Sequence, residues 1–183
     1  MLKKSTILPR ILHVDDDQEF LLAFSLTFKD HFNITSFDNP CSAIDILKNV
    51  HFDLVISDYE MPEMTGIEFM KEIKKDLPGI PVIFLTGQGN EQVARDAFVS
   101  GASDYFPKDI YGFAYKEKLI NSISNLIEKN RAIEALKESE ERNKSFLNHF
   151  QGVAFRLDHN FRPILLKGAV KAITGYCKAE ILN

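Results

Sequence analysis

Acidic, hydroxyl and basic side chains follow apolar runs of the sequence at four places. The residues are Asp15 and Asp16 after the first run, Asp58 after the third, Thr86 at the end of the fourth and Lys108 after the fifth. Crowded carboxylates repel one another unless a cation lies among them, and Mg²⁺ suits oxygen ligands. A carboxylate can also attack phosphorus as a nucleophile. These residue types therefore predict a Mg²⁺-dependent site at which an aspartate accepts a phosphoryl group.

The chemistry of phosphoryl transfer explains the other members of the set. Charge spreads over the equatorial phosphoryl oxygens, so the site needs Mg²⁺ on one side and a cation such as Lys108 on another. The hydroxyl of Thr86 can donate a hydrogen bond to a phosphoryl oxygen. Each residue alone has an ordinary explanation as a turn residue, a helix cap or a solvated side chain. Their joint position after four apolar runs favours a functional site.

Short apolar runs alternate with helical patterns along the first 125 residues. The strands that we expect cover residues 11–14, 33–37, 54–56, 82–85 and 104–106. This alternation predicts parallel strands, and continuous apolar runs are typical of strands that helices cover on both faces. We expect an α/β fold with a flavodoxin-like, doubly wound, five-stranded parallel sheet in the order 2-1-3-4-5. Ligands bind beyond the carboxyl ends of the strands in such sheets, which is where the polar residues fall.

Local signals mark several helix ends. Asn39 precedes a proline and has the residue type of an N-cap, and Thr65 and Glu68 have the spacing of a capping box. Asn90 is expected to cap the fourth helix, and Gly101 suits the C′ position that follows it.

The helical pattern after residue 113 is longer than one small domain can bury. A helix over residues 114–148 would be about 50 Å long at roughly 1.5 Å per residue. Its apolar stripe weakens in the second half, where Asn130, Lys137 and Glu140 interrupt it. We interpret residues 126–148 as a linker helix. A two-stranded coiled coil that forms a homodimer and a solvated single helix both remain open.

The bulk composition excludes several classes of protein. The net charge of −4 does not fit a chain that binds nucleic acid over its whole surface, which would be basic. Cys41 and Cys177 match no metal-binding spacing and are expected to be free thiols in a reducing compartment. The sequence contains neither a signal peptide nor an apolar run of ~18 residues, so we expect a cytoplasmic fragment without a membrane span.

Four sequence motifs stand at the ends of the expected strands. They are Val14–Asp17, Ser57–Gly66, Leu85–Gly87 and Gly101–Lys108. In this order and spacing they are highly specific, and over roughly residues 9–125 the sequence resembles bacterial and archaeal response-regulator receiver domains. The resemblance implies a receiver domain over residues 1–125. The implied function is that of a signalling phosphoacceptor and not of an enzyme. Such a phosphoacceptor catalyses only its own phosphorylation and dephosphorylation.

The resemblance also implies a role for individual residues. Asp58 matches the phosphoacceptor, Asp16 the direct Mg²⁺ ligand, and Asp15 the carboxylate that acts mainly through water. The backbone carbonyl of Glu60 matches a third contact to the metal, and Tyr105 matches the aromatic residue that turns inward on activation. Thr86 matches the switch hydroxyl and Lys108 the phosphate-binding lysine. The side chains of Glu60 and Gln88 occupy positions that influence the phosphoryl lifetime.

One position departs from the family pattern. The family usually has proline after the lysine, often with a cis peptide bond, whereas this chain has Lys108-Asp109. A cis bond before a residue other than proline costs about 3–4 kcal/mol. The bond is therefore either cis, with the strain retained for function, or trans. If it is trans, the loop into the last helix differs from the loop that is usual in the family.

The last 35 residues form a separate segment. Residues 153–158 alternate like a strand, His159 and Asn160 suit a turn, and residues 163–166 suit a second strand. The tail, with Gly175–Leu182 and the acidic stretch before it, resembles the opening of a PAS domain. So short a segment cannot build its own core, and we expect residues 149–183 to be an incomplete PAS domain.

Three functional hypotheses follow. In the first, a sensor histidine kinase or a phosphotransfer protein phosphorylates Asp58, and the last helix transmits the state to the PAS segment. In the second, the chain is an aspartate-nucleophile phosphohydrolase of the haloacid-dehalogenase kind, for which Asp15-Asp16-Asp17 contains the Asp-x-Asp spacing. In the third, the domain is an interaction module that is never phosphorylated.

Overall fold

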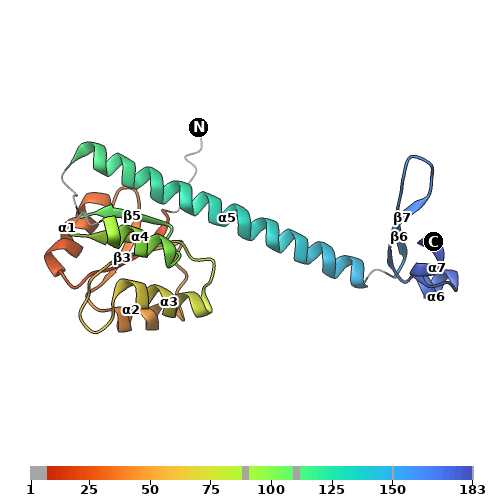
Figure 1. Ribbon diagram of the computed structural model, residues 1–183, viewed down its shortest axis with the longest axis horizontal. Coiled ribbons are helices and arrows are strands. Elements are labelled where there is room, and N and C mark those ends of the chain that lie inside the picture. Colours follow the sequence, from red (N-terminus) through yellow and green to blue (C-terminus); the bar gives the residue numbers. More distant parts are fainter. Residues whose placement is uncertain (1–7, 88–90, 109–111, 150, 183) are drawn as a thin grey trace. The chain divides into compact units, whose positions relative to one another are not determined.

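The computed structural model describes residues 8–87, 91–108, 112–149 and 151–182, and the chain divides into two compact units, 1–131 and 132–183. Strands and helices alternate throughout the first unit (Figure 1). Its elements are β1 (Arg10–Val14), α1 (Gln18–Phe28), β2 (Asn33–Phe37), α2 (Pro40–Leu47), β3 (Leu54–Asp58), α3 (Gly66–Asp76), β4 (Val82–Thr86), α4 (Glu91–Val99) and β5 (Asp104–Pro107). The helix α5 (Phe113–His149) follows them.

The five strands of the first unit form one parallel sheet in the order β2-β1-β3-β4-β5. This is the order that the sequence analysis predicted, and the expected strand positions are confirmed to within a residue or two. A parallel sheet needs a crossover after every strand, and right-handed crossovers on both faces produce this doubly wound arrangement.

Two apolar cores lie on opposite faces of the sheet. Successive residues of a strand point to opposite faces, so Val55 packs with the side chains of α2 and α3, whereas Ile56 packs with those of α1 and α5. Phe69 is fully buried in the first core and Phe24 in the second. Because both faces are covered, β3 and β4 are buried along their whole length. This explains the continuous apolar runs in the sequence.

The predicted helix caps are confirmed wherever the structure describes them. The side chain of Asn39 accepts a hydrogen bond from the backbone of Ser42, and Thr65 and Glu68 form a complete capping box at the start of α3. Gly101 follows α4 with φ of +96°, the left-handed conformation that glycine adopts most easily. The expected cap at Asn90 and the Lys108-Asp109 peptide bond lie outside the described residues.

The helix α5, which begins in the first unit and continues past residue 131, confirms the long helix that the sequence predicted. It has 37 residues, which corresponds to about 55 Å at ~1.5 Å per residue. Leu119, Ile123 and Ile127 are buried against the sheet, whereas Ile133 and Leu136 are exposed. None of the described helices, α5 included, combines the length and the apolar character that a membrane span requires.

The second unit contains an antiparallel pair of strands and two short helices. They are β6 (Val153–Leu157), β7 (Pro163–Gly168), α6 (Val170–Thr174) and α7 (Lys178–Leu182). The two strands and the turn between them were predicted, and the carboxylate of Asp158 accepts the backbone N–H groups of Asn160 and Arg162 within that turn. The helix α6 was not predicted, because it is only five residues long.

Candidate functional site

The register of the parallel sheet aligns the polar residues at one edge. Asp58 ends β3 opposite Leu85 of β4, and Thr86 ends β4 opposite Pro107 of β5. The backbone N–H of Lys108 continues this ladder by donating to the carbonyl of Thr86 at 2.8 Å. The carboxyl ends of β1, β3, β4 and β5 therefore present their polar residues at the same level.

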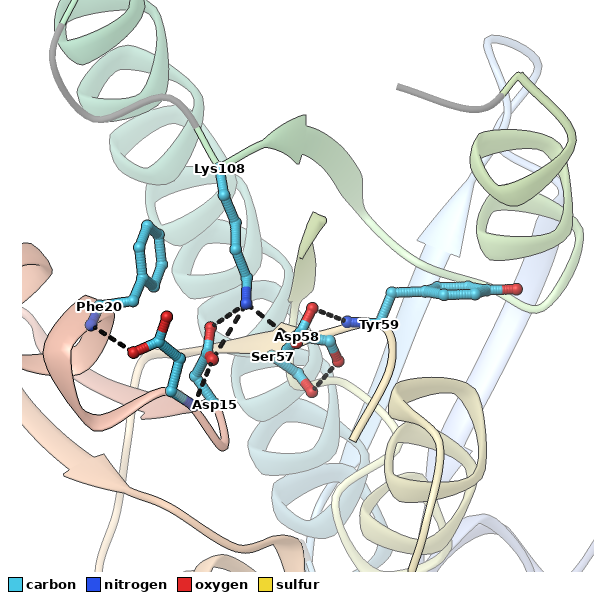
Figure 2. Close-up of polar contacts among 7 residues, drawn as sticks. Asp15, Phe20, Ser57, Asp58, Tyr59 and Lys108 are labelled. Carbon is cyan, nitrogen blue, oxygen red and sulfur yellow. Dashed lines mark hydrogen bonds and ion pairs between the residues drawn. The ribbon is translucent and has the colours of Figure 1, made fainter. Parts of the chain in front are cut away.

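Lys108 joins the carboxylates of two different strands (Figure 2). Its Nζ atom lies 2.9 Å from Oδ2 of Asp58 and 2.8 Å from Oδ2 of Asp15, and it donates to Oδ1 of Asp15 at 3.0 Å. All three side chains are largely buried, with 16% of the Lys108 side chain exposed. The order of the strands predicted that these residues converge, and the structure places the three side chains in direct contact.

A backbone N–H group also donates to each carboxylate. Asp17 donates to Oδ1 of Asp15 at 3.0 Å, and Tyr59 donates to Oδ1 of Asp58 at 2.7 Å. One oxygen of the Asp58 carboxylate therefore accepts from a backbone N–H group, and the other accepts from the ammonium of Lys108. Its orientation is fixed before any substrate arrives.

Burial is the largest single influence on the pKa values of Asp15, Asp58 and Lys108. Burial raises the pKa of Asp15 and of Asp58 above the ordinary value, although the hydrogen bonds from Lys108 oppose the shift. Burial alone would lower the pKa of Lys108, but the two carboxylates outweigh it and the pKa is raised. The pocket thus concentrates acidic groups whose ionisation a further cation would favour.

His13 lies on β1 next to this pocket and is fully buried. Burial, assisted by the positive charge of Lys108, lowers the pKa of His13 to about 3. Among the described residues neither of its ring nitrogens has a hydrogen-bond partner. The imidazole is therefore neutral around neutral pH.

Oxygen atoms of Asp15, Asp16 and Asp58 form the one group of acidic or metal-binding side chains, within the described chain, that could hold an ion. One carboxylate oxygen from each lies within 4.8 Å of the other two. The buried Oδ2 atom of Asp15 has no aligned hydrogen-bond donor among the described residues, although the ammonium of Lys108 is close to it. An all-oxygen set with an exposed member at Asp16 suits Mg²⁺, which keeps several water ligands.

Residues 11–124 match the family described as the response regulator receiver domain. The chain belongs to this family. Receiver domains are signalling phosphoacceptors that interact with histidine kinases or phosphotransfer proteins, and the site described above fits a phosphoacceptor. The family does not favour the phosphohydrolase alternative.

Individual relatives agree with this assignment. The chain is 36% identical over 101 residues to the transcriptional regulatory protein ZraR of Klebsiella oxytoca, a match that covers 55% of this chain and 23% of ZraR. It is 35% identical over 77 residues to the transcriptional regulatory protein FixJ of Bradyrhizobium diazoefficiens, covering 42% of this chain and 38% of FixJ. The matches therefore span well under half the length of these relatives.

A solved structure shows the same fold. The response regulator receiver domain protein of Clostridium thermocellum has 29% sequence identity and a TM-score of 0.61, and the match covers 69% of this chain and 99% of that protein. The match therefore spans nearly the whole of that receiver domain protein, whereas it spans 23% of ZraR and 38% of FixJ.

The other residues for which the sequence predicted a role are Thr86, Glu60, Tyr105 and Gln88. Thr86 is 7% exposed at the end of β4, and Glu60 is exposed two residues after Asp58. Tyr105 is half-buried on β5 and packs against the core that contains Phe84. Gln88 lies outside the described residues.

Two contacts of the receiver domain were missed by the sequence analysis. The ring centroid of Phe20 lies 5.0 Å from Nζ of Lys108, and a Cβ atom on Gly66 would lie 2.2 Å from the backbone carbonyl of Asp58. The sequence contained a partial signal for each. Phe20 begins the apolar face of α1 immediately after the acidic motif, and Gly66 follows a capping threonine where no glycine is needed for capping.

Proposed function

We propose that Asp58 is the phosphoryl acceptor of this receiver domain and that the reaction requires Mg²⁺ bound by Asp15, Asp16, Asp58 and the backbone carbonyl of Glu60. The observation that carries this proposal is the contact of a single ammonium, that of Lys108, with both buried carboxylates, beside three acidic oxygens close enough to share an ion. When bound, Mg²⁺ neutralises charge on the phosphoryl oxygens during transfer.

The transfer is a simple displacement at phosphorus. A carboxylate oxygen of Asp58 forms a bond to phosphorus, and the bond from phosphorus to the donor breaks, so that the donor leaves with the electron pair. Lys108 exchanges its contact with Asp58 for one with a phosphoryl oxygen, and Thr86 donates its hydroxyl to another. Tyr105 then turns inward, and we propose that this pair of residues acts as the conformational switch.

The donor and the output belong to the same proposal. A sensor histidine kinase or a phosphotransfer protein supplies the phosphoryl group, and the chain itself turns over no other substrate. The reaction takes place in the cytoplasm, where phosphodonors made from ATP are available. We propose no nucleic-acid partner for this part of the protein, because a net charge of −4 does not fit a chain that is basic over its whole surface.

The second half of α5 and the segment after it transmit the phosphorylated state. Ile133 and Leu136 expose 55% and 63% of their surface on a helix that continues to residue 149, which supports a homodimer through this helix. The second unit exposes Phe155, Phe161 and Tyr176. Apolar surface of this kind needs a covering partner, which supports the proposal that residues 149–183 form part of a PAS domain.

Phosphorylation by a small donor tests the acceptor directly. The 183-residue chain is incubated with acetyl phosphate and Mg²⁺, and intact-protein mass spectrometry measures the addition of one phosphoryl group. We expect incorporation into the wild type and into the control Asp45→Asn, whose carboxylate is exposed on α2. We expect none in Asp58→Asn or without Mg²⁺. Incorporation into Asp58→Asn would refute the assignment.

A further inference from the structure

The ammonium of Lys108 has one side that no carboxylate covers. It carries three N–H donors, and the carboxylates of Asp15 and Asp58 account for two directions. In a third direction the ring of Phe20 lies with its centroid 5.0 Å from Nζ. Figure 2 shows this ring beside the Lys108 side chain, on the side away from Asp58. A cation within about 6 Å of an aromatic face is attracted to it, most strongly where water is excluded.

The core of the domain holds the ring of Phe20 in place. Phe20 packs edge-on against His13, with 5.9 Å between ring centroids and 70° between planes, and it lies 6.2 Å from Phe24. Both of these neighbours are fully buried. The ring is therefore supported from behind by a rigid aromatic cluster, and its front is turned to Lys108.

We propose that Phe20 is a positioning residue for phosphoryl transfer, because it holds the ammonium of Lys108 against the two carboxylates and keeps water from its open side. This inference rests on the proposed function of Asp58. With Phe20 in place, the ring covers one side of the ammonium and the two carboxylates cover the other, so its position beside the acceptor is restricted. A side chain that confines a catalytic cation in this way lowers the entropy lost on reaching the transition state.

Rates of phosphorylation of four versions of the 183-residue chain test the proposal. They are the wild type, Phe20→Leu, Phe20→Tyr and Leu22→Ala, the last being exposed on the same helix. With acetyl phosphate at saturating Mg²⁺, we expect Phe20→Leu to lower the maximal rate about three- to tenfold. Phe20→Tyr keeps an aromatic face and should restore the wild-type rate, and Leu22→Ala should not change it. Equal rates for the wild type and Phe20→Leu, or an equal loss in Phe20→Tyr, would overturn the proposal.

Nuclear magnetic resonance of the wild-type chain provides a test that does not depend on a variant being folded. Protons that lie over an aromatic ring shift upfield, so the ε-methylene protons of Lys108 should resonate upfield of those of Lys48, which lies exposed on the surface. Identical shifts for the two lysines would overturn the contact with Phe20. A wild-type chain that shows the upfield shift but takes up no phosphate would instead refute the proposed function and leave the contact intact.

Discussion

The Nζ atom of Lys108 lies 2.9 Å from Oδ2 of Asp58, although 50 positions separate the two residues in the sequence. The same ammonium contacts Asp15, which follows a different strand. One cation thus offsets two buried negative charges, and the register of the parallel strands brings the three groups together.

Replacement of Lys108 by methionine should destabilise the protein in the absence of Mg²⁺. Two buried carboxylates would lose a shared donor, which costs about 1–3 kcal/mol in the free energy of unfolding. Urea denaturation measures the loss, and added Mg²⁺ should reverse part of it. Lys48→Met removes an exposed ammonium that pairs with Asp45, and it should have little effect. Equal losses in the two variants would show that the Lys108 contacts add nothing to stability.

Mg²⁺ should stabilise the folded chain through the acidic cluster. At a concentration ten times its dissociation constant, a ligand that binds only the folded state adds about 1.4 kcal/mol to the free energy of unfolding. Thermal denaturation with and without Mg²⁺ measures this increase. We expect it to be lost in Asp16→Asn and kept in Asp45→Asn, which removes a carboxylate far from the cluster. A stabilisation that persists in Asp16→Asn would place the ion elsewhere.

The stability of the metal-free protein should depend on the ionisation of Asp58. Burial raises the pKa of this carboxyl in the folded state, so the folded state binds the proton more tightly than the unfolded state does. The contribution of this site to stability is therefore greatest at acid pH and falls as pH rises from the ordinary aspartate pKa through the raised one.

Asp58→Asn tests this pH dependence, because asparagine has a similar shape and no charge. The variant should be more stable than the wild type at neutral pH without Mg²⁺, by on the order of 1 kcal/mol. The difference should shrink as pH falls toward 4. Denaturation curves at several pH values give the comparison, and a wild type that is more stable than Asp58→Asn at neutral pH would contradict the raised pKa.

Gly66→Ala should destabilise the loop that carries the acceptor. An added Cβ atom would lie 2.2 Å from the carbonyl oxygen of Asp58 and 2.8 Å from the ring of Phe84. The backbone must move to relieve this overlap, which costs about 1–3 kcal/mol. Gly87→Ala is the matched control, since no atom of the described residues, apart from its chain neighbours, lies within 4 Å of the added Cβ there. Chemical denaturation should separate the two variants, and equal stability would mean that the loop adjusts freely.

Arg131→Ala should loosen the part of α5 that leaves the sheet. The guanidinium donates through Nε at 3.1 Å and through Nη2 at 2.6 Å to Oδ1 of Asp53, whose side chain is only 9% exposed just before β3. Loss of this pair should cost about 1 kcal/mol and increase hydrogen exchange around residues 127–135. Arg142→Ala, which breaks an exposed pair with Glu138, should leave exchange in that region unchanged.

Much of the receiver fold could be predicted because its signals are local. The apolar runs of β3 and β4, the N-cap at Asn39 and the capping box at Thr65 each depend on residues only a few positions apart. The same is true of the placement of Asp58 and Thr86 at strand ends. A parallel sheet then leaves few ways to connect the strands, so that the acidic edge followed from the order of the elements.

The contacts inside the site depended on tertiary structure. Side-chain torsions and the register of strands far apart in the chain determine which oxygen of Asp58 contacts Lys108 and how closely Asp16 approaches. They also determine how the ring of Phe20 covers the ammonium. Phe20 resembled an ordinary core residue because the periodicity of α1 does not reveal what lies beyond its first turn. Local sequence therefore determined which groups reach the edge of the sheet, and packing decided which of them touch.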